Sequence, residues 1–82
     1  MTNNDIIENL ENQLFDLYYT AQISEHNEDK HGQIKALREA EAVHKTGIRL
    51  LPGDKWAMRL DDARSRAIDD AFMQYSTRYD TF

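Results

Sequence analysis

A chain of 82 residues can form one domain with a single hydrophobic core and is too short for a second independent domain. Fifteen acidic and ten basic side chains give a net charge of -5, which argues against binding to nucleic acid or anionic membranes through overall charge. The chain has no cysteine, so a disulfide framework, a zinc-thiolate site and a thiol nucleophile are excluded.

Residues 1–5 are mostly polar and lack the basic and then apolar regions of a signal peptide. No apolar run approaches the roughly 18 residues that a membrane-spanning helix needs. The absence of cysteine also fits a reducing compartment. We therefore expect a cytoplasmic protein with no membrane partner.

Apolar residues at helical spacing predict a first helix over residues 4–23. The residues that carry this pattern are Ile6, Ile7, Leu10, Leu14, Leu17, Tyr18 and Ala21. Residues 24–29 have no apolar side chain and offer Ser24 and Asn27 as capping groups. This stretch is therefore predicted to form the first turn.

A second helix is predicted over residues 28–51, and Pro52 with Gly53 ends it. Its apolar side is formed by Ile34, Leu37, Ala40, His44, Ile48 and Leu51. Asp54 is expected to cap the third helix, which is predicted over residues 54–79. Its pattern consists of Trp56, Leu60, Ala63, Ala67, Ile68, Ala71, Phe72, Tyr75 and Tyr79. Period-two alternation is absent, so no strand is predicted.

Two short connections between three long helices favour an all-α, up-down-up antiparallel three-helix bundle, with residues 1–82 as one helical domain. The first and third helices then run in the same direction, and Trp56 closes the end of the core opposite to Tyr75 and Tyr79. Small residues that face each other are expected to let the second and third helices approach closely. They are Ala36, Ala40, Val43 and Gly47 on one helix and Ala63, Ala67 and Ala71 on the other.

A second apolar row on the first helix falls outside its core stripe, which spans about 120°. The row consists of Phe15, Tyr19 and Ile23. Its acidic rim consists of Glu8, Glu11 and Asp16. Either the third helix covers this row with its aromatic tail, or the row is a contact surface for a partner. The predicted protein-binding surface is this row with its rim, extended to Tyr75, Tyr79 and Phe82.

Four bases of the second helix project within about 80° of one another. They are Lys35, Arg38, Lys45 and Arg49. This basic stripe is either a solvated face beside the acids of the first helix, or a site for phosphate, nucleic acid or an acidic protein. Nucleic-acid binding is the weaker hypothesis, because interleaved stacking aromatic residues and a basic overall charge are missing.

Two polar residues lie in the middle of apolar stripes, His44 on the second helix and Arg64 on the third. Buried polar groups need partners, and spacing along the helix offers Glu41 for His44 and Asp61 for Arg64. Satisfied polar pairs are therefore expected there, unless one of the two marks an interface or a pocket.

The sequence shows no catalytic pattern. His26 and His31 would project about 140° apart on a helix, too far to share a metal ion. The acidic pairs 61–62 and 69–70 lie beside Arg59 and Arg66, which are expected to neutralise them. We therefore expect no enzyme activity, no cofactor and no metal site.

These observations favour a small acidic interaction module, an adaptor or an inhibitor that binds a larger protein. This size and character are common among accessory proteins of phages and mobile elements. A structural homodimer, in which the row of Phe15 pairs with itself across a two-fold axis, is the alternative. A nucleic-acid-binding module on the basic stripe is the third hypothesis.

Overall fold

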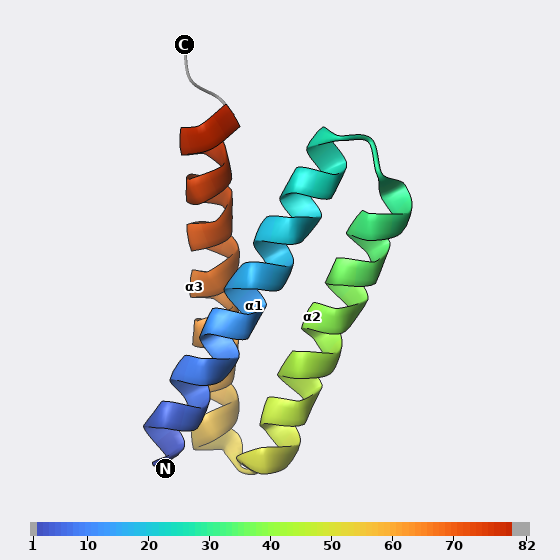
Figure 1. Ribbon diagram of the computed structural model, residues 1–82. Coiled ribbons are helices and arrows are strands. Elements are labelled where there is room, and N and C mark those ends of the chain that lie inside the picture. Colours follow the sequence, from blue (N-terminus) through green and yellow to red (C-terminus); the bar gives the residue numbers. More distant parts are fainter. Residues whose placement is uncertain (1, 80–82) are drawn as a thin grey trace.

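The computed structural model of the chain describes residues 2–79 (Figure 1). They form three helices, α1 (Asn3–His26), α2 (Lys30–Leu50) and α3 (Asp54–Tyr79), and they contain no strand. The predicted all-α fold is confirmed, and the packing of α1 against both other helices is compatible with a helical bundle. Within residues 2–79, no helix is long and apolar enough to cross a membrane.

A capping box starts α1. The Thr2 hydroxyl oxygen accepts from the Asp5 backbone N–H at 3.2 Å, and the Asp5 carboxylate accepts from the Thr2 N–H at 3.1 Å. Two backbone donors that the first turn leaves without helical partners are thereby satisfied.

The first turn is shorter than the sequence predicted, because α1 continues through Ser24 to His26. The assignment of residues 24–26 to the turn was therefore wrong. These residues are helical, and Ser24 is buried. Asn27 is the C-cap, and Glu28 adopts a left-handed conformation with φ of 60°. Asp29 then caps α2, since its carboxylate accepts from the Gly32 N–H at 3.0 Å.

The second turn is built around Pro52. Leu51 has φ of -125° and ψ of 73°, outside the helical region that a following proline disfavours. Gly53 follows with φ of +114°, a conformation that side-chain-bearing residues rarely adopt. The Gly53 carbonyl accepts from the Ala57 N–H at 3.0 Å, so Asp54 is the first helical residue and not the cap. Its carboxylate still favours the positive end of the helix dipole.

The core lies between α1 and the two other helices, in two clusters. One contains Ile7, Leu10, Leu51, Leu60 and Ala63, and the other contains Leu14, Ala40 and Ala67. Trp56 packs against the first cluster together with Ile6, as predicted for the end of the core. Leucines of α1 therefore hold both other helices.

The small residues were expected to bring α2 and α3 together, but they pack mainly on α1. Ala40 and Ala67 are fully buried around Leu14 of α1. At Gly47, a Cβ atom would lie 2.9 Å from Leu10 Cδ1 and 3.0 Å from Leu60 Cδ2, so the glycine makes room for two leucines. Figure 1 shows α2 and α3 converging near the Pro52 turn and separating toward their other ends.

This separation overturns part of the predicted core. Five residues that the helical pattern assigned to the interior are substantially exposed, and all of them except Ile48 lie where α2 and α3 separate (Figure 1). They are Ile34, Leu37, Ile48, Ile68 and Phe72.

Candidate protein-binding surface

Aromatic rings line the contact between the carboxyl-terminal halves of α1 and α3. Phe15 and Tyr19 stack with centroids 5.9 Å apart and planes 6° from parallel. His26 of α1 lies 4.6 Å from the Tyr79 ring and 5.9 Å from the Tyr75 ring, and these two tyrosine rings are 5.1 Å apart. We call these five residues, Phe15, Tyr19, His26, Tyr75 and Tyr79, the aromatic seam.

Polar contacts fix the rings of the seam. The Tyr75 hydroxyl lies 3.0 Å from His26 Nδ1. Arg78 Nη1 donates to the Tyr19 hydroxyl oxygen at 3.3 Å, and its guanidinium carbon lies 5.6 Å from the Tyr79 ring centroid. The hydrogen bond to Tyr19 raises the pKa of Arg78 above its usual value. Arg78 thus links the two parts of the seam.

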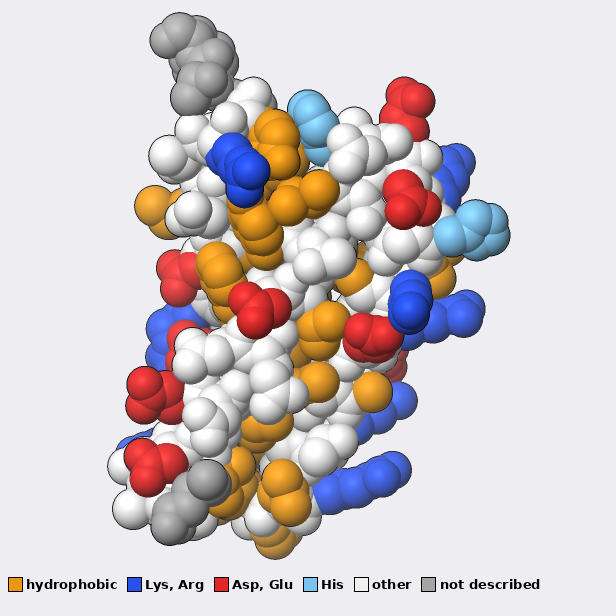
Figure 2. Space-filling model, in the orientation of Figure 1, with side chains coloured by type: hydrophobic (Ala, Val, Ile, Leu, Met, Phe, Trp, Pro, Cys, Tyr) orange, Lys and Arg blue, Asp and Glu red, His pale blue; other side chains and the backbone are white. Residues whose placement is uncertain are grey.

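The outer row of α1 is only partly covered in the structure. Phe15, Tyr19 and Ile23 are all half-buried, and Arg78 of α3 contacts Tyr19. Phe15 also packs against the core cluster of Leu14. Figure 2 shows hydrophobic side chains gathered over the upper parts of α1 and α3. Phe82, the last predicted contact residue, lies outside the described residues.

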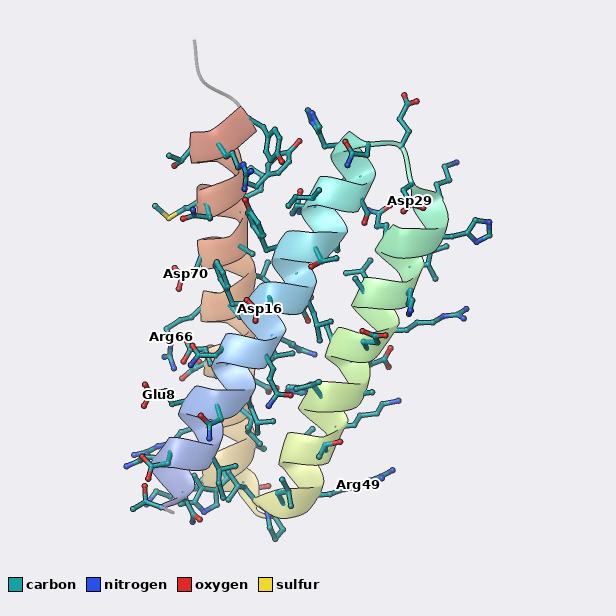
Figure 3. The ribbon with its side chains drawn as sticks, in the orientation of Figure 1. Glu8, Asp16, Asp29, Arg49, Arg66 and Asp70 are labelled. Atoms are coloured by element: carbon teal, nitrogen blue, oxygen red, sulfur yellow. The ribbon has the colours of Figure 1, made fainter. Side chains whose placement is uncertain are left out.

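The acidic rim divides into two kinds of residue. Glu11 is half-buried and forms a bidentate pair with Arg66, at 3.1 Å from Nε and 3.4 Å from Nη2. This hydrogen bond, followed by the charge of Glu11, raises the pKa of Arg66. Glu8 and Asp16 are exposed and form no ion pair within residues 2–79 (Figure 3). Only these two remain available to a partner's bases.

His26 is the seam residue that the sequence did not assign to this site. A polar turn was predicted around it, but the extra helical turn of α1 carries His26 to the level of Tyr75. The sequence signal for the longer helix is Asp29. An N-cap at this residue starts α2 at Lys30 and leaves residues 24–26 for α1. His31 is exposed on α2 and takes no part in the seam.

The basic stripe of α2 is exposed as expected, and Figure 3 shows Arg49 pointing away from the bundle. Lys45 Nζ lies 3.2 Å from Glu41 Oε1. Lys35, Arg38 and Arg49 form no ion pair within the described part of the chain. The acids of α1 therefore do not neutralise this stripe.

The acids of α3 also differ from expectation. Arg66 pairs with Glu11 of α1, and Arg59 donates to the side-chain oxygen of Asn4 at 2.9 Å. Asp62 and Asp69 form no ion pair within residues 2–79. The pKa of Arg66 is raised mainly by Glu11, and the charges of Asp62 and Asp70 add a smaller effect. The prediction of a salt-bridged face was wrong here, because both arginines turn toward α1.

His44 has a partner on another helix. Its Nε2 lies 3.0 Å from Asp61 Oδ1, and Arg64 Nη2 lies 4.0 Å from the same oxygen. Glu41, the partner expected for His44, pairs with Lys45 instead. The expected pair of Arg64 with Asp61 is present, and Asp61 therefore serves both residues.

Tyr18 lies near this group, and burial raises the pKa of its hydroxyl above the usual value of 10.0, with Arg64 opposing and Glu41 adding to the effect. A raised pKa in the folded state means that its stability contribution is complete below pH 10 and is lost as the pH rises through the folded-state value. We expect wild type to lose more stability than Tyr18→Phe between pH 8 and about pH 11, measured by urea unfolding. Equal losses in the two proteins would contradict this prediction.

Among residues 2–79, no three His, Asp or Glu side chains are grouped so as to hold a metal ion. The geometry instead presents a fixed aromatic surface with two free carboxylates at its edge. A scan against protein-family models and searches of curated proteins and of solved structures gave no match to this chain.

Proposed function

We propose that this chain is a protein-protein interaction module, an adaptor or inhibitor, that binds a larger protein through the aromatic seam of α1 and α3. The observation that carries the proposal is the packing of four half-buried aromatic rings where α1 meets α3. They are Phe15, Tyr19, Tyr75 and Tyr79. Aromatic side chains are enriched at the centres of protein interfaces, where they bury large areas.

The proposal takes the up-down-up, antiparallel order of the helices as its framework. Two contacts support this order: His26 at the end of α1 contacts Tyr75 near the end of α3, and Gln33 near the start of α2 donates to Glu25 at 3.4 Å. In this arrangement, the aromatic seam is formed by the carboxyl-terminal parts of α1 and α3, which lie at the same end of the bundle.

Preorganisation supports a binding role for these rings. Phe15 stacks on Tyr19, and Arg78 holds Tyr19 from α3. Ordering a side chain on binding costs about 0.5–1.5 kcal/mol, and rings that are already fixed avoid most of this cost. The free carboxylates of Glu8 and Asp16 favour a partner whose apolar contact surface is bordered by Lys or Arg.

The test compares two matched variants in affinity capture from the native cell. Tyr19→Ala with Asp16→Lys alters the seam, and Lys35→Glu with Met58→Ala alters exposed residues elsewhere. Tyr19 is preferred to Phe15, because Phe15 also packs on the core and its loss would lower stability. We expect the proteins retained by wild type to be lost at least tenfold with the seam variant and kept with the control variant.

Circular dichroism of both variants accompanies the capture, and equal helicity is expected because the changed residues are half-exposed or exposed. Retention of the same proteins by the folded seam variant would contradict the proposal. A partner lost only with the control variant would move the binding site to the exposed surfaces of α2 and α3 around Lys35 and Met58.

A further inference from the structure

A second apolar surface lies where α2 and α3 border each other. We call it the α2/α3 face, formed by Ile34, Leu37, Ile48, Ile68 and Phe72. These side chains are between 42% and 55% exposed. Leu37 and Ile48 lie seven residues before and four residues after His44, and Ile68 lies seven after Asp61, so helical spacing places them on the same sides of α2 and α3 as the His44–Asp61 contact.

These residues differ from ordinary exposed apolar residues, because they form a row on each of two helices. Single exposed leucines are normal on protein surfaces, but two such rows favour a covering element. Neither α2 nor α3 supplies it, because both pack on α1 and separate from each other beyond the His44–Asp61 contact (Figure 1).

The outer edges of this face carry opposite charges. On α2, Arg38 and Lys45 follow the apolar row about 20–40° further around the helix than Ile34. On α3, Asp69 follows it about 60° beyond Phe72. Asp62 lies about 20° further, where it borders a pocket with Arg66 and with Ile7 of α1. Within residues 2–79, Arg38, Asp62 and Asp69 form no ion pair, and Lys45 pairs only with Glu41 of its own helix.

We propose that the α2/α3 face binds a second copy of this chain across a two-fold axis parallel to the helices, with α2 of each copy on α3 of the other. This axis sets the basic edge of each α2 beside the acidic edge of α3 in the partner copy, twice. The perpendicular two-fold axis would set α2 against α2 and place the two basic edges together, which like-charge repulsion disfavours.

The heights of the residues agree with this arrangement. We count along both helices from the His44–Asp61 contact at about 1.5 Å per residue. Leu37 then lies at the level of Ile68, and Ile34 lies within one residue of the level of Phe72. Arg38 and Asp69 differ in height by only about 3 Å, and so do Lys45 and Asp62. Apolar side chains therefore oppose apolar ones, and bases oppose acids.

Sedimentation of the full chain from about 5 μM to about 500 μM tests the proposal, because a dimer dissociates on dilution. We expect a monomer-dimer equilibrium and a melting temperature that rises with concentration. Leu37→Glu is expected to weaken the dimer at least hundredfold, since it places a charge in the apolar contact. Asp16→Lys on the other side of α1 is the matched control and should leave the dimer unchanged.

A charge exchange tests the orientation of the two copies. Arg38→Glu and Asp69→Arg should each weaken the dimer about tenfold, because each repeats twice in the symmetric contact. The protein with both changes should recover to within about threefold of wild type, since the opposite charges meet again. The perpendicular axis predicts no such recovery.

The proposal is overturned by a wild-type chain that stays monomeric throughout this range with a constant melting temperature. A dimer that tolerates Leu37→Glu but is lost with Tyr19→Ala would also overturn it, and would place the two-fold contact on the aromatic seam. The dependence of the wild-type melting temperature on protein concentration tests the dimer without any variant. A variant that fails to fold therefore does not prevent this test. Failure of the dimer leaves the capture experiment on the seam unaffected, because the dimer is tested through Leu37, Arg38 and Asp69, which the capture variants do not change.

Discussion

Leu60→Ala is expected to lower the free energy of unfolding by about 2–5 kcal/mol. Leu60 is 2% exposed and joins all three helices, because its cluster contains Leu10 of α1 and Leu51 at the end of α2. A domain of this size has a total stability of about 4–12 kcal/mol, so one cavity removes a large part of it. Urea unfolding followed by circular dichroism measures the loss.

Met58→Ala is the matched control on the same helix. Met58 is 70% exposed, and a change of at most about 0.5 kcal/mol is expected there. Similar losses for the two variants would show that Leu60 does not belong to the core.

Gly47→Ala sharpens the test, because the added methyl group would point at the Leu60 side chain. When Gly47→Ala is the only change, crowding of the new methyl group against Leu60 and Leu10 costs about 1–3 kcal/mol and offsets the higher helix propensity of alanine. With alanine at position 60, half of that crowding is gone and the cavity is partly filled. We therefore expect the double variant to be more stable than the two single effects predict, by about 1 kcal/mol or more.

The helices could be predicted from the sequence because their signals are local. Pro52 ends α2 and Gly53 has a positive φ, and neither effect needs a contact from elsewhere in the chain. The end of α1 was placed incorrectly, because it does not depend on local signals alone. Residues 24–26 resemble a turn by composition, but Ser24 is buried against the rest of the protein, and this tertiary contact extends α1.

Burial could be predicted only in part. Periodicity identifies which side of a helix is apolar, but it does not show whether another helix covers that side. Ala40 and Ala67 are buried because Leu14 of α1 packs on both. Leu37 and Ile68 have the same periodicity and are exposed, because α1 separates the two helices that carry them. The α2/α3 face is the result.

The seam and the polar pairs show the same limit. The stack of Phe15 on Tyr19 follows from a spacing of four residues on one helix. The contact of His26 with Tyr75 joins residues 49 positions apart, and nothing in the local sequence indicates it. Arg66 was assigned to acids of its own helix, but Glu11 of α1 offers it bidentate geometry.

Asp61→Ala is expected to lower the free energy of unfolding by about 1–2 kcal/mol, because it removes the partner of a buried histidine nitrogen. His44 is 7% exposed, and its Nε2 lies 3.0 Å from the Asp61 carboxylate. That carboxylate only accepts hydrogen bonds, so the ring nitrogen is the donor. The cost lies in the lower part of the usual range, since the Asp61 side chain is 60% exposed and water can reach the site.

A double-mutant cycle separates this contact from other effects of Asp61. In a His44→Leu background, Asp61→Ala should cost at most about 0.5 kcal/mol, because no buried donor remains to be satisfied. Glu41→Ala is the control for the partner that spacing along α2 suggests. It should cost less than about 0.5 kcal/mol, since Glu41 forms only an exposed pair with Lys45.

Two outcomes would contradict the assignment. An equal cost of Asp61→Ala in both backgrounds would show that Asp61 acts through Arg64 and not through His44. A cost of Glu41→Ala that disappears in the His44→Leu background would instead identify Glu41 as the partner. The contact matters beyond stability, because it is a polar contact between α2 and α3 beyond which the apolar sides of these two helices stay open. Its loss should therefore alter the α2/α3 face, while the stacked rings of Phe15 and Tyr19 on α1 remain in place.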